Sequence, residues 1–222
     1  ELAIKKKVSR FIFASSASVY GIKKDKKVTE TLSLEPISIY NKAKMITERT
    51  ILSYSNKINI SIIRPATVCG VSPRMRFDVS VNMMAYQALK NSRMTVFGGQ
   101  QTRPNIHIDD LLDIYILFFS KNKKFNGIFN AGFENLKIID IAKKVQKLIP
   151  SKIDIIKNNI DIRDYRIDSS KLLLLGFKPK KNVNTAIAEI LETYRGKIKN
   201  VDKKTFSIKW LQKNYKKFFN LS

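Results

Sequence analysis

The sequence predicts an α/β fold that begins with part of an open parallel sheet and continues into a smaller, mixed α/β region. Two short runs, residues 10–14 and 59–64, contain the aromatic and β-branched residues typical of buried strands. Between them Ser38 can cap a helix whose apolar residues recur near helical spacing up to Leu52. A strand, a loop over residues 15–36, a helix and a second strand, in this order, are typical of a parallel sheet.

After Gly70 the predicted elements become shorter. We expect two domains, residues 1–70 and 71–222, with some elements of the second region returning to the first. The expected helices cover residues 77–89, a segment capped by Asp109 and Asp110 and running to about Ser120, residues 136–149 and residues 185–194; the expected strands cover 94–97, 127–131 and 153–156.

The charge of the chain indicates a solvated basic surface. Its 222 residues include 42 Lys and Arg against 18 Asp and Glu, which gives a formal net charge of +24. Most of these basic residues are lysines in small scattered clusters, whereas proteins that recognise phosphates usually favour the planar fork of arginine. We therefore expect attraction of small anions and no dedicated nucleic-acid partner.

The rare residue types exclude several classes of protein. With one Cys and one His the chain has neither an internal disulfide framework nor a zinc-ligand cluster. We interpret Cys69 as buried packing and His107 as a structural hydrogen-bonding residue. The longest apolar stretch, residues 111–119, is far shorter than the roughly 18 residues that cross a membrane. We expect no signal peptide, no membrane partner and a cytoplasmic location.

Three polar residues are expected to converge where the first strand ends. Tyr40 and Lys44 lie four residues apart, on one face of the predicted helix. A nearby ammonium stabilises a phenolate, and the same lysine can hold a ribose hydroxyl. Ser16 follows the first strand, at the sheet edge where open α/β sheets bind ligands. Serine can donate to a substrate oxygen while tyrosine moves its proton, which predicts a redox site beside a hydride carrier.

These motifs closely resemble the extended short-chain dehydrogenases/reductases, in particular the NAD-dependent nucleotide-sugar epimerase/dehydratase family. The resemblance covers most of the chain in the expected order. It rests on Phe-Ile-Phe-Ala-Ser-Ser-Ala-Ser-Val-Tyr-Gly (11–21), Tyr-Asn-Lys-Ala-Lys (40–44), Ile-Ile-Arg-Pro-Ala-Thr-Val-Cys-Gly (62–70), Ser-Pro-Arg-Met-Arg-Phe-Asp (72–78), Val-Phe-Gly (96–98), Arg-Pro-Asn-Ile-His-Ile-Asp-Asp (103–110), Phe-Asn-Ala-Gly (129–132) and Leu-Gly-Phe-Lys-Pro (175–179).

The resemblance implies a partial Rossmann-type parallel sheet without its N-terminal strands, and a smaller mixed α/β substrate domain. Residues 1–70 would be the C-terminal part of an NAD-binding domain, and residues 71–222 would bind a nucleoside-diphosphate sugar. The implied catalytic residues are Ser16, Tyr40 and Lys44. NAD would lie against Ser15, Tyr40, Lys44, Pro65 and Ala66; the sugar nucleotide would lie against Ser18, Asn82 (diphosphate), Phe97 (base), Arg103 (diphosphate) and either Arg163 or Arg166.

Departures from the family pattern narrow the range of reactions that the resemblance implies. Dehydratases of the family carry Asp-Glu directly after the catalytic hydroxyl, where this chain has Ala17 and Ser18. Without these carboxyls dehydration is disfavoured, and the resemblance favours an epimerase acting through a transient keto sugar. Thr67 stands where many sugar epimerases have Asn, which leaves the sugar open. A nucleotide-sugar reductase on the same scaffold is the neighbouring alternative.

A second alternative concerns the cofactor half of the fold. No Gly-x-Gly-x-x-Gly run occurs, and the first glycine is Gly21. The chain therefore looks like the C-terminal two-thirds of an enzyme. It could be a catalytically silent fragment, or one half of a split enzyme whose N-terminal half is a separate chain. The family resemblance also implies a homodimer, and the tail from Trp210 to Phe219 is expected to be a docking helix rather than a membrane-surface helix.

Overall fold

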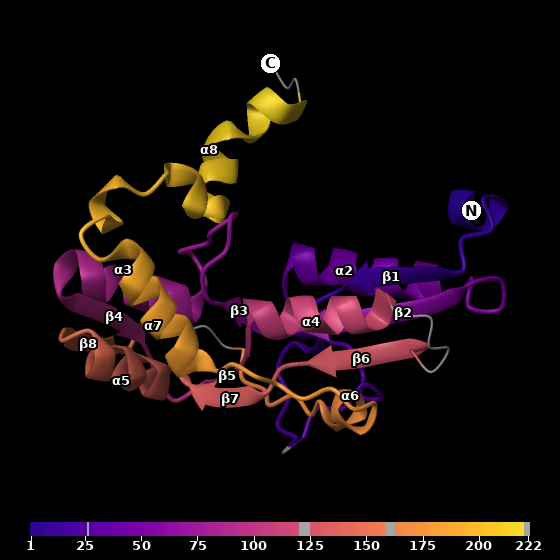
Figure 1. Ribbon diagram of the computed structural model, residues 1–222, viewed down its shortest axis with the longest axis horizontal. Coiled ribbons are helices and arrows are strands. Elements are labelled where there is room, and N and C mark those ends of the chain that lie inside the picture. Colours follow the sequence, from indigo (N-terminus) through magenta and orange to yellow (C-terminus); the bar gives the residue numbers. More distant parts are fainter. Residues whose placement is uncertain (26, 120–124, 159–162, 220–222) are drawn as a thin grey trace. The chain divides into compact units, whose positions relative to one another are not determined.

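The computed structural model describes residues 1–25, 27–119, 125–158 and 163–219 (Figure 1). The chain forms two compact units. One unit contains Glu1–Val68, Gln101–Lys137 and Asp161–Asn182, and the other contains Cys69–Gln100, Ile138–Ile160 and Val183–Ser222. Each unit is therefore assembled from three separate stretches of the sequence.

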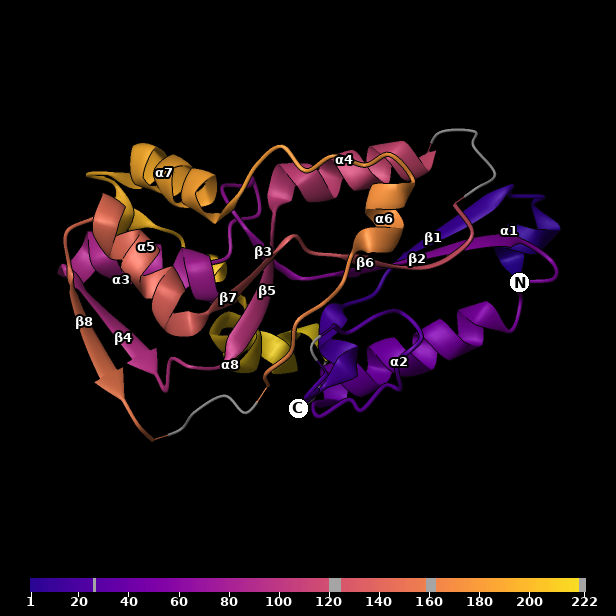
Figure 2. The ribbon, with the colours of Figure 1, turned by 90° about the horizontal axis from the view of Figure 1, so that it is seen from below.

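A three-stranded parallel sheet forms the centre of the first unit. Its strands are β1 (Arg10–Ala14), β2 (Asn59–Pro65) and β6 (Gly127–Ala131), in the order β1-β2-β6. Helices α2 (Ile39–Leu52) and α4 (Ile108–Phe119) cover opposite faces of this sheet, as Figure 2 shows. The predicted α/β class with a parallel sheet is confirmed, and the carboxyl ends of β1 and β2 lie at one edge.

The main apolar core of the first unit lies on the α4 side of the sheet. Ile114 and Phe118 of α4 are fully buried with Ile63 of β2 and Phe129 of β6. The ring of Phe118 stacks on that of Phe125 at 4.7 Å and meets Phe129 edge-on at 4.9 Å. Each of these side chains contributes about 1.5–3 kcal/mol by leaving water, so this core fixes β2 and β6 behind the site.

The remaining strands of the first unit correct one sequence-based boundary. β5 (Thr102–His107) pairs antiparallel with β7 (Glu134–Lys137), and both belong to a sheet with β3 (Thr67–Cys69). The helix predicted from residue 136 therefore begins later, as α5 (Ile138–Leu148), because the residues before it pair with β5.

The start of α4 also differs from the prediction. The helix begins at Ile108, so Asp109 and Asp110 lie in its first turn rather than at the cap. The cap is the His107 ring, whose Nδ1 accepts the Asp109 backbone N–H at 3.1 Å. The predicted end near Ser120 lies outside the described residues.

Asp110 fastens the 180–181 segment onto α4, and we expect this contact to matter for stability. Its side chain is 1% exposed, and its two oxygens accept the backbone N–H groups of Lys180 at 2.9 Å and Lys181 at 3.2 Å. Asp110→Asn replaces one acceptor by a donor, which leaves a buried N–H unpaired. We predict a loss of about 1–3 kcal/mol in the free energy of unfolding, measured by urea denaturation.

A neighbouring aspartate supplies the matched control. Asp113 pairs with the Lys180 ammonium at 2.8 Å on the surface of the same helix. Exposed ion pairs contribute little to stability, so Asp113→Asn should leave the urea midpoint nearly unchanged. Equal effects of the two substitutions would contradict the role assigned to Asp110.

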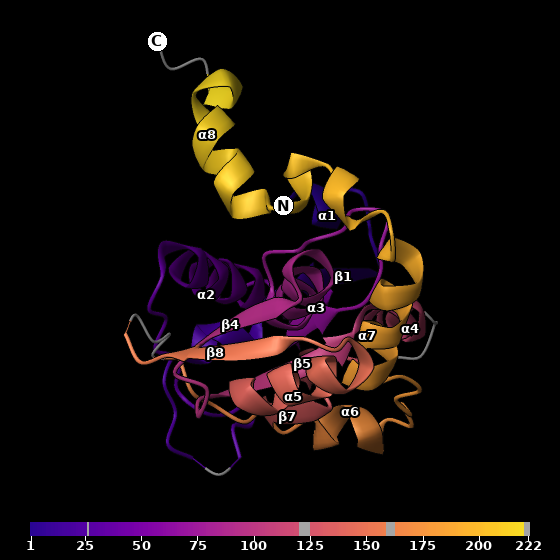
Figure 3. The same cartoon turned by 90° about the vertical axis from the view of Figure 1, so that its left-hand side faces the viewer.

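The second unit packs helices around a two-stranded parallel sheet (Figure 3). Strands β4 (Arg93–Phe97) and β8 (Lys152–Ile156) pair along their full lengths. Helix α3 (Ser80–Asn91) packs against α5 and α7 (Val183–Tyr194). The prediction of a helix from residue 77 was wrong at its start, because Phe77 is fully buried in a cluster of rings with Tyr86, Tyr194 and Phe206.

Shorter elements complete the two units. No helix among the described residues is long and apolar enough to cross a lipid bilayer. The remaining elements are α1 (Leu2–Lys5), the 3₁₀ turn η1 (Ala17–Tyr20), α6 (Ser170–Leu174), the turns η2 (Ile198–Asn200) and η3 (Lys203–Thr205), and α8 (Ser207–Phe219), whose side chains from Lys216 on lie outside the described part. η1 lies within the segment that the sequence predicted as loop.

Asp78 ties the start of α8 to the segment before α3 and makes this contact sensitive to acid. The carboxylate accepts from Arg76 Nε and from the backbone N–H of Ile208, both at 2.9 Å. Burial opposes the charge of Asp78, but the hydrogen bonds from Arg76 and Ile208 outweigh it and lower the pKa below the ordinary value of 3.8. The folded chain therefore holds this proton less tightly than the unfolded chain.

The sign of the pH dependence follows from this difference. The Asp78 contribution is present above about pH 4 and is lost as the pH falls through the lower, folded-state pKa. We predict that Asp78→Asn destabilises the protein at neutral pH and that the difference shrinks in acid, measured by denaturant midpoints across a pH series. The exposed Asp25→Asn serves as control. A difference that grows as the pH falls would contradict the assignment.

Candidate active site

The carboxyl end of β1 turns directly into a hydrogen-bonded chain of polar side chains. Ser16 has extended backbone geometry, and its Oγ accepts the backbone N–H of Ser18 at the start of η1. The hydroxyls of Ser16 and Ser18 lie 2.7 Å apart, and Ser18 donates to Asn41 Oδ1, also at 2.7 Å. Because Ser18 has one hydroxyl hydrogen and gives it to Asn41, Ser16 is the donor in the serine pair.

Asn41 was not singled out by the sequence. It is 2% exposed and directly follows Tyr40. It links the start of α2 to the turn formed by residues 16–18, the serine turn. Its Nδ2 is buried without a hydrogen-bond partner among the described residues. A buried amide in this position holds α2 against Ser18.

Tyr40 and Lys44 lie in the first turns of α2, whose start is fixed by Ser38. The Ser38 hydroxyl accepts the backbone N–H of Asn41, as the predicted cap requires. Lys44 Nζ donates to the Ala14 carbonyl at the end of β1, 2.7 Å away, and lies 5.7 Å from the centre of the Tyr40 ring. The Tyr40 side chain is 57% exposed. The helix thus presents an accessible phenol, with an ammonium anchored to the strand that carries Ser16.

A second phenol interacts with Tyr40. Burial, and to a smaller degree the charge of a nearby Tyr40 phenolate, raise the pKa of Tyr115 on α4. Tyr115 is therefore a weaker acid than a free phenol. The sequence offered no signal for this residue beyond its place on an apolar helix.

A buried ion pair lies directly beneath the serine turn. Arg64 of β2 and Glu48 of α2 are 2% and 1% exposed, and two parallel hydrogen bonds of 3.0 and 2.6 Å join them. Burial opposes the charge of Arg64, but its interactions with Glu48, chiefly the hydrogen bonds that it donates to the carboxylate, outweigh this effect, so the pKa of the guanidinium is raised. Ser15, predicted to lie near NAD, is 4% exposed and donates its hydroxyl to Glu48.

Pro65 is the last residue of β2, and Ala66 directly after it still hydrogen-bonds to β6. Pro65 stands opposite Ala131, and Ala66 donates its backbone N–H to the Ala131 carbonyl at 2.8 Å. A Cβ at Gly132 would lie 2.5 Å from the Ala66 side chain, so only glycine fits there. This close packing fixes the backbone of Ala66 beside the carboxyl ends of the strands.

The residues predicted to bind the sugar nucleotide are divided between the two units. Asn82 and Phe97 belong to the second. Asn82 is 4% exposed, accepts the Gly70 N–H, and donates to the Gly70 and Arg76 carbonyls, so it braces the 70–76 loop. Phe97 ends β4 and is 39% exposed, which leaves part of its ring accessible.

The three predicted phosphate arginines belong to the first unit. Arg103 on β5 is 6% exposed and donates to the carbonyls of Thr102 and Arg163. Arg163 is half-buried, whereas Arg166 is exposed and accepts the Val28 N–H with its carbonyl. The Arg103 side chain thus contacts the Arg163 backbone, whereas the Arg166 backbone contacts Val28.

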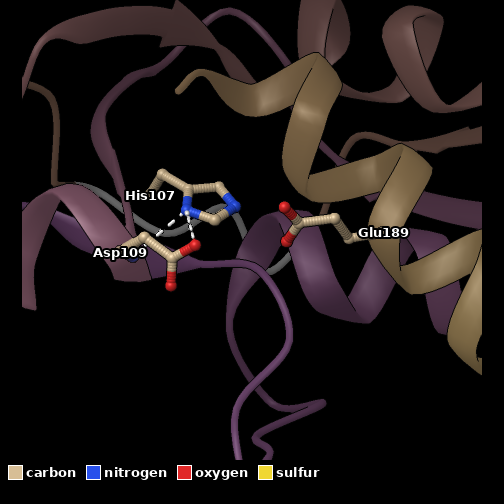
Figure 4. Close-up of side chains that lie close together, drawn as sticks. All are labelled: His107, Asp109 and Glu189. Atoms are coloured by element: carbon tan, nitrogen blue, oxygen red, sulfur yellow. Dashed lines mark hydrogen bonds and ion pairs between the residues drawn. The ribbon is translucent and has the colours of Figure 1, made fainter. Parts of the chain in front are cut away.

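His107 and Cys69 have structural surroundings. Figure 4 shows the His107 ring directed at Asp109, with Nδ1 4.0 Å from the Asp109 carboxylate and accepting its backbone N–H. The ring is 2% exposed. This confirms the structural interpretation of His107, and Cys69 is a buried free thiol as expected.

Comparisons with known proteins point to one family. A family model described as "NAD dependent epimerase/dehydratase family" matches residues 1–132. The chain is 29% identical over 228 residues to UDP-glucose 4-epimerase of Lactobacillus helveticus, covering 89% of this chain. It is 31% identical over 214 residues to ADP-L-glycero-D-manno-heptose-6-epimerase of Brachyspira hyodysenteriae, covering 88% of this chain.

The fold is also found in a dehydratase. The solved structure of TunA, an NAD dependent-NDP-hexosamine 5,6-dehydratase, matches with a TM-score of 0.78 and 20% identity over 92% of this chain. The chain spans 67% of the length of each of these three proteins.

Proposed function

The chain belongs to the NAD-dependent epimerase/dehydratase family, and on this premise we propose that it inverts a carbon of a nucleoside-diphosphate sugar as part of an NAD-dependent epimerase. The observation that carries the proposal is the position of Lys44, which lies 5.7 Å from the centre of the Tyr40 ring and donates to the Ala14 carbonyl at the end of β1, just before Ser16. Both curated relatives named above are epimerases of nucleoside-diphosphate sugars.

The donors at the end of β1 fit the nicotinamide end of NAD. Among the described residues Lys44 Nζ makes one hydrogen bond, to Ala14, and an ammonium has three hydrogens to donate. Two remain for ribose hydroxyls. Pro65 and Ala66 would lie beside the ring, and when bound NAD supplies the hydride acceptor. The glycine-rich run that holds a dinucleotide pyrophosphate in Rossmann folds does not occur in this sequence.

Proton transfer is assigned to Tyr40. Tyr40 acts as an accessible phenolate, whose negative charge the Lys44 ammonium stabilises; it accepts the proton of a sugar hydroxyl and, as the phenol, later returns it. The Ser16 hydroxyl would donate its hydrogen to the sugar oxygen instead of to Ser18, and this hydrogen bond would orient the sugar. Positioned acid–base groups of this kind contribute about 10²–10⁴-fold to a rate.

The residues after Ser16 support epimerisation over dehydration. Ala17 is fully buried, and the Ser18 hydroxyl is engaged by Asn41 and Ser16. Neither position holds a carboxyl, which removal of water from the sugar would need as an acid and base. From the family resemblance we also propose that Asn82, Phe97, Arg103 and one of Arg163 and Arg166 contact the sugar nucleotide.

The proposal also includes protein partners that would bind at α2 and at β1. β1 pairs with one neighbour, β2, among the described strands, and α2 exposes Ile39 at 87% and Ile46 at 58%. A second copy of the chain would pack on α2, and a separately encoded N-terminal half would extend the sheet beyond β1. Cys69, as a buried thiol, is consistent with the reducing cytoplasm that we propose as the location.

The test uses the complete gene product with UDP-glucose as a first probe and NAD below the sugar concentration. We expect the epimer, identified by NMR, to accumulate to many equivalents per NAD. A reductase would instead consume reduced cofactor in stoichiometric amount. Stoichiometric consumption, or no epimer from any of a panel of nucleoside-diphosphate sugars, would contradict the proposal.

A further inference from the structure

Four buried polar side chains adjoin the proposed proton-transfer residues Ser16, Tyr40 and Lys44 and are assigned no proton transfer themselves. Ser15, Tyr20, Glu48 and Arg64 are between 0 and 4% exposed. They come from four different elements: the segment after β1, η1, α2 and β2. Buried polar groups on four separate elements are costly to keep unless their hydrogen bonds are complete.

Their hydrogen bonds form one connected set. Arg64 grips both oxygens of Glu48, and Ser15 donates to the Oε1 of the same carboxylate. The third nitrogen of Arg64 donates to the Tyr20 hydroxyl at 2.7 Å, and Tyr20 donates onward to Asn130 Oδ1 at 2.8 Å. Burial raises the pKa of Tyr20 despite the lowering effect of Arg64, so its hydroxyl stays protonated and able to donate.

Stability alone does not explain a buried ion pair. The cost of removing both charges from water cancels much of their attraction, and a well-packed apolar pair is often as stable. Directional hydrogen bonds, in contrast, fix the geometry of every group they join. The question is therefore which groups this pair holds in place.

Each partner is adjacent to a residue of the proposed active site. Ser15 directly precedes Ser16. Glu48 follows Lys44 by one helical turn and Tyr40 by about two turns, on the same face of α2. The carboxylate of Glu48 thus joins the strand end that carries Ser16 to the helix that carries the other two residues, and Arg64 fixes the carboxylate from β2.

We propose that Glu48 and Arg64 are positioning residues that hold Ser16 in register with Tyr40 and Lys44, an inference that rests on the function proposed above. Lys44 bonded to the Ala14 carbonyl is a second link between α2 and β1, but it is itself part of the site. The Glu48–Arg64 pair would therefore keep Ser16 in place relative to Tyr40 and Lys44 even when Lys44 changes its hydrogen-bond partner.

The variant that tests this role is Glu48→Leu combined with Arg64→Met. A single substitution leaves one buried charge unpaired and can unfold the chain, whereas the double change replaces both charges by apolar groups of similar size. The matched control is Arg93→Met with Asp154→Leu, which removes an ion pair of 3.1 Å on paired strands β4 and β8.

The first measurement is hydrogen–deuterium exchange followed by mass spectrometry. With the double variant folded, we expect amides in residues 15–20 and 39–45 to exchange about tenfold faster, and those of 93–97 to keep their rate. The control should leave residues 15–20 and 39–45 unchanged. Unchanged exchange in residues 15–20 and 39–45 of the folded double variant would overturn the inference, whatever reaction the protein catalyses.

The second measurement separates positioning from packing in the complete gene product. We expect the double variant to lose about tenfold to a hundredfold in kcat, with KM for the sugar nucleotide within about twofold, since small displacements of reacting groups are costly. Faster local exchange with an unchanged kcat would overturn the positioning role. Absence of epimerase activity in the unmodified protein would reject the proposed function, and the exchange result would still decide whether Glu48 and Arg64 hold this register.

Discussion

Replacing Arg64 alone by methionine is expected to lower the free energy of unfolding by about 3–5 kcal/mol, because it leaves a buried charge uncompensated. Glu48 is 1% exposed and would lose its two hydrogen bonds from Arg64. Tyr20 would lose the Arg64 donor as well. This loss is a large fraction of the 5–15 kcal/mol that is typical for a folded domain.

Urea denaturation followed by circular dichroism measures this effect. Arg93→Met is the control, because Arg93 pairs with Asp154 on the surface and should change the midpoint little. Adding Glu48→Leu to Arg64→Met is expected to recover most of the lost stability. A midpoint for Arg64→Met equal to that of Arg93→Met would show that the buried pair carries no such penalty.

Replacing Tyr40 by phenylalanine is expected to lower kcat of the complete gene product by about 10²–10⁴-fold, the range for a positioned acid–base group. Phenylalanine keeps the ring beside Lys44 and removes only the hydroxyl. Tyr40 is 57% exposed, so neither the fold nor the affinity for the sugar nucleotide should change much. The effect is measured as the initial rate of epimer formation at saturating sugar nucleotide.

Tyr54→Phe is the matched control for this substitution. Tyr54 follows α2, and its hydroxyl contacts Glu1 at 3.4 Å rather than the serine turn. Its rate should equal that of the unmodified protein. A Tyr40→Phe variant with full turnover would remove Tyr40 from the mechanism, even if Ser16 and Lys44 remained essential.

Local patterns were sufficient to predict the parallel sheet and the helix that carries Tyr40 and Lys44. The apolar runs of β1, β2 and β6 are explicit in the sequence, and Ser38 caps α2 as its position predicts. The spacing of Tyr40 and Lys44 needs only helical geometry to bring them together. These features depend on residues close in sequence, which is why the pattern was informative.

The buried pair could not be predicted in the same way. Glu48 looked like an ordinary charged residue of an exposed helix, and Arg64 was one basic residue among many. Their meeting depends on how α2 packs on β2, which no local pattern specifies. One signal was present: Arg64 is a charge inside an otherwise apolar strand, and such a residue needs a buried partner.

The sequence patterns also misplaced the starts of two helices, α3 and α4. Phe77 has a helical pattern after it, yet it is drawn into the ring cluster of the second unit, so α3 begins at Ser80. The His107 ring displaced Asp109 and Asp110 as the cap of α4. In both cases tertiary contacts decided between local alternatives.

The most direct test of the account is epimerisation by the complete gene product in heavy water. If Tyr40 removes the hydroxyl proton of the sugar, the hydrogen on the inverted carbon would leave and return as a hydride, and a hydride carried in this way does not exchange with solvent. We predict that mass spectrometry and NMR find the epimer without deuterium on that carbon, and that Tyr40→Phe forms it at least about a hundredfold more slowly. Deuterium at the inverted carbon would show that a proton leaves carbon instead, and would contradict the role assigned to Ser16, Tyr40 and Lys44.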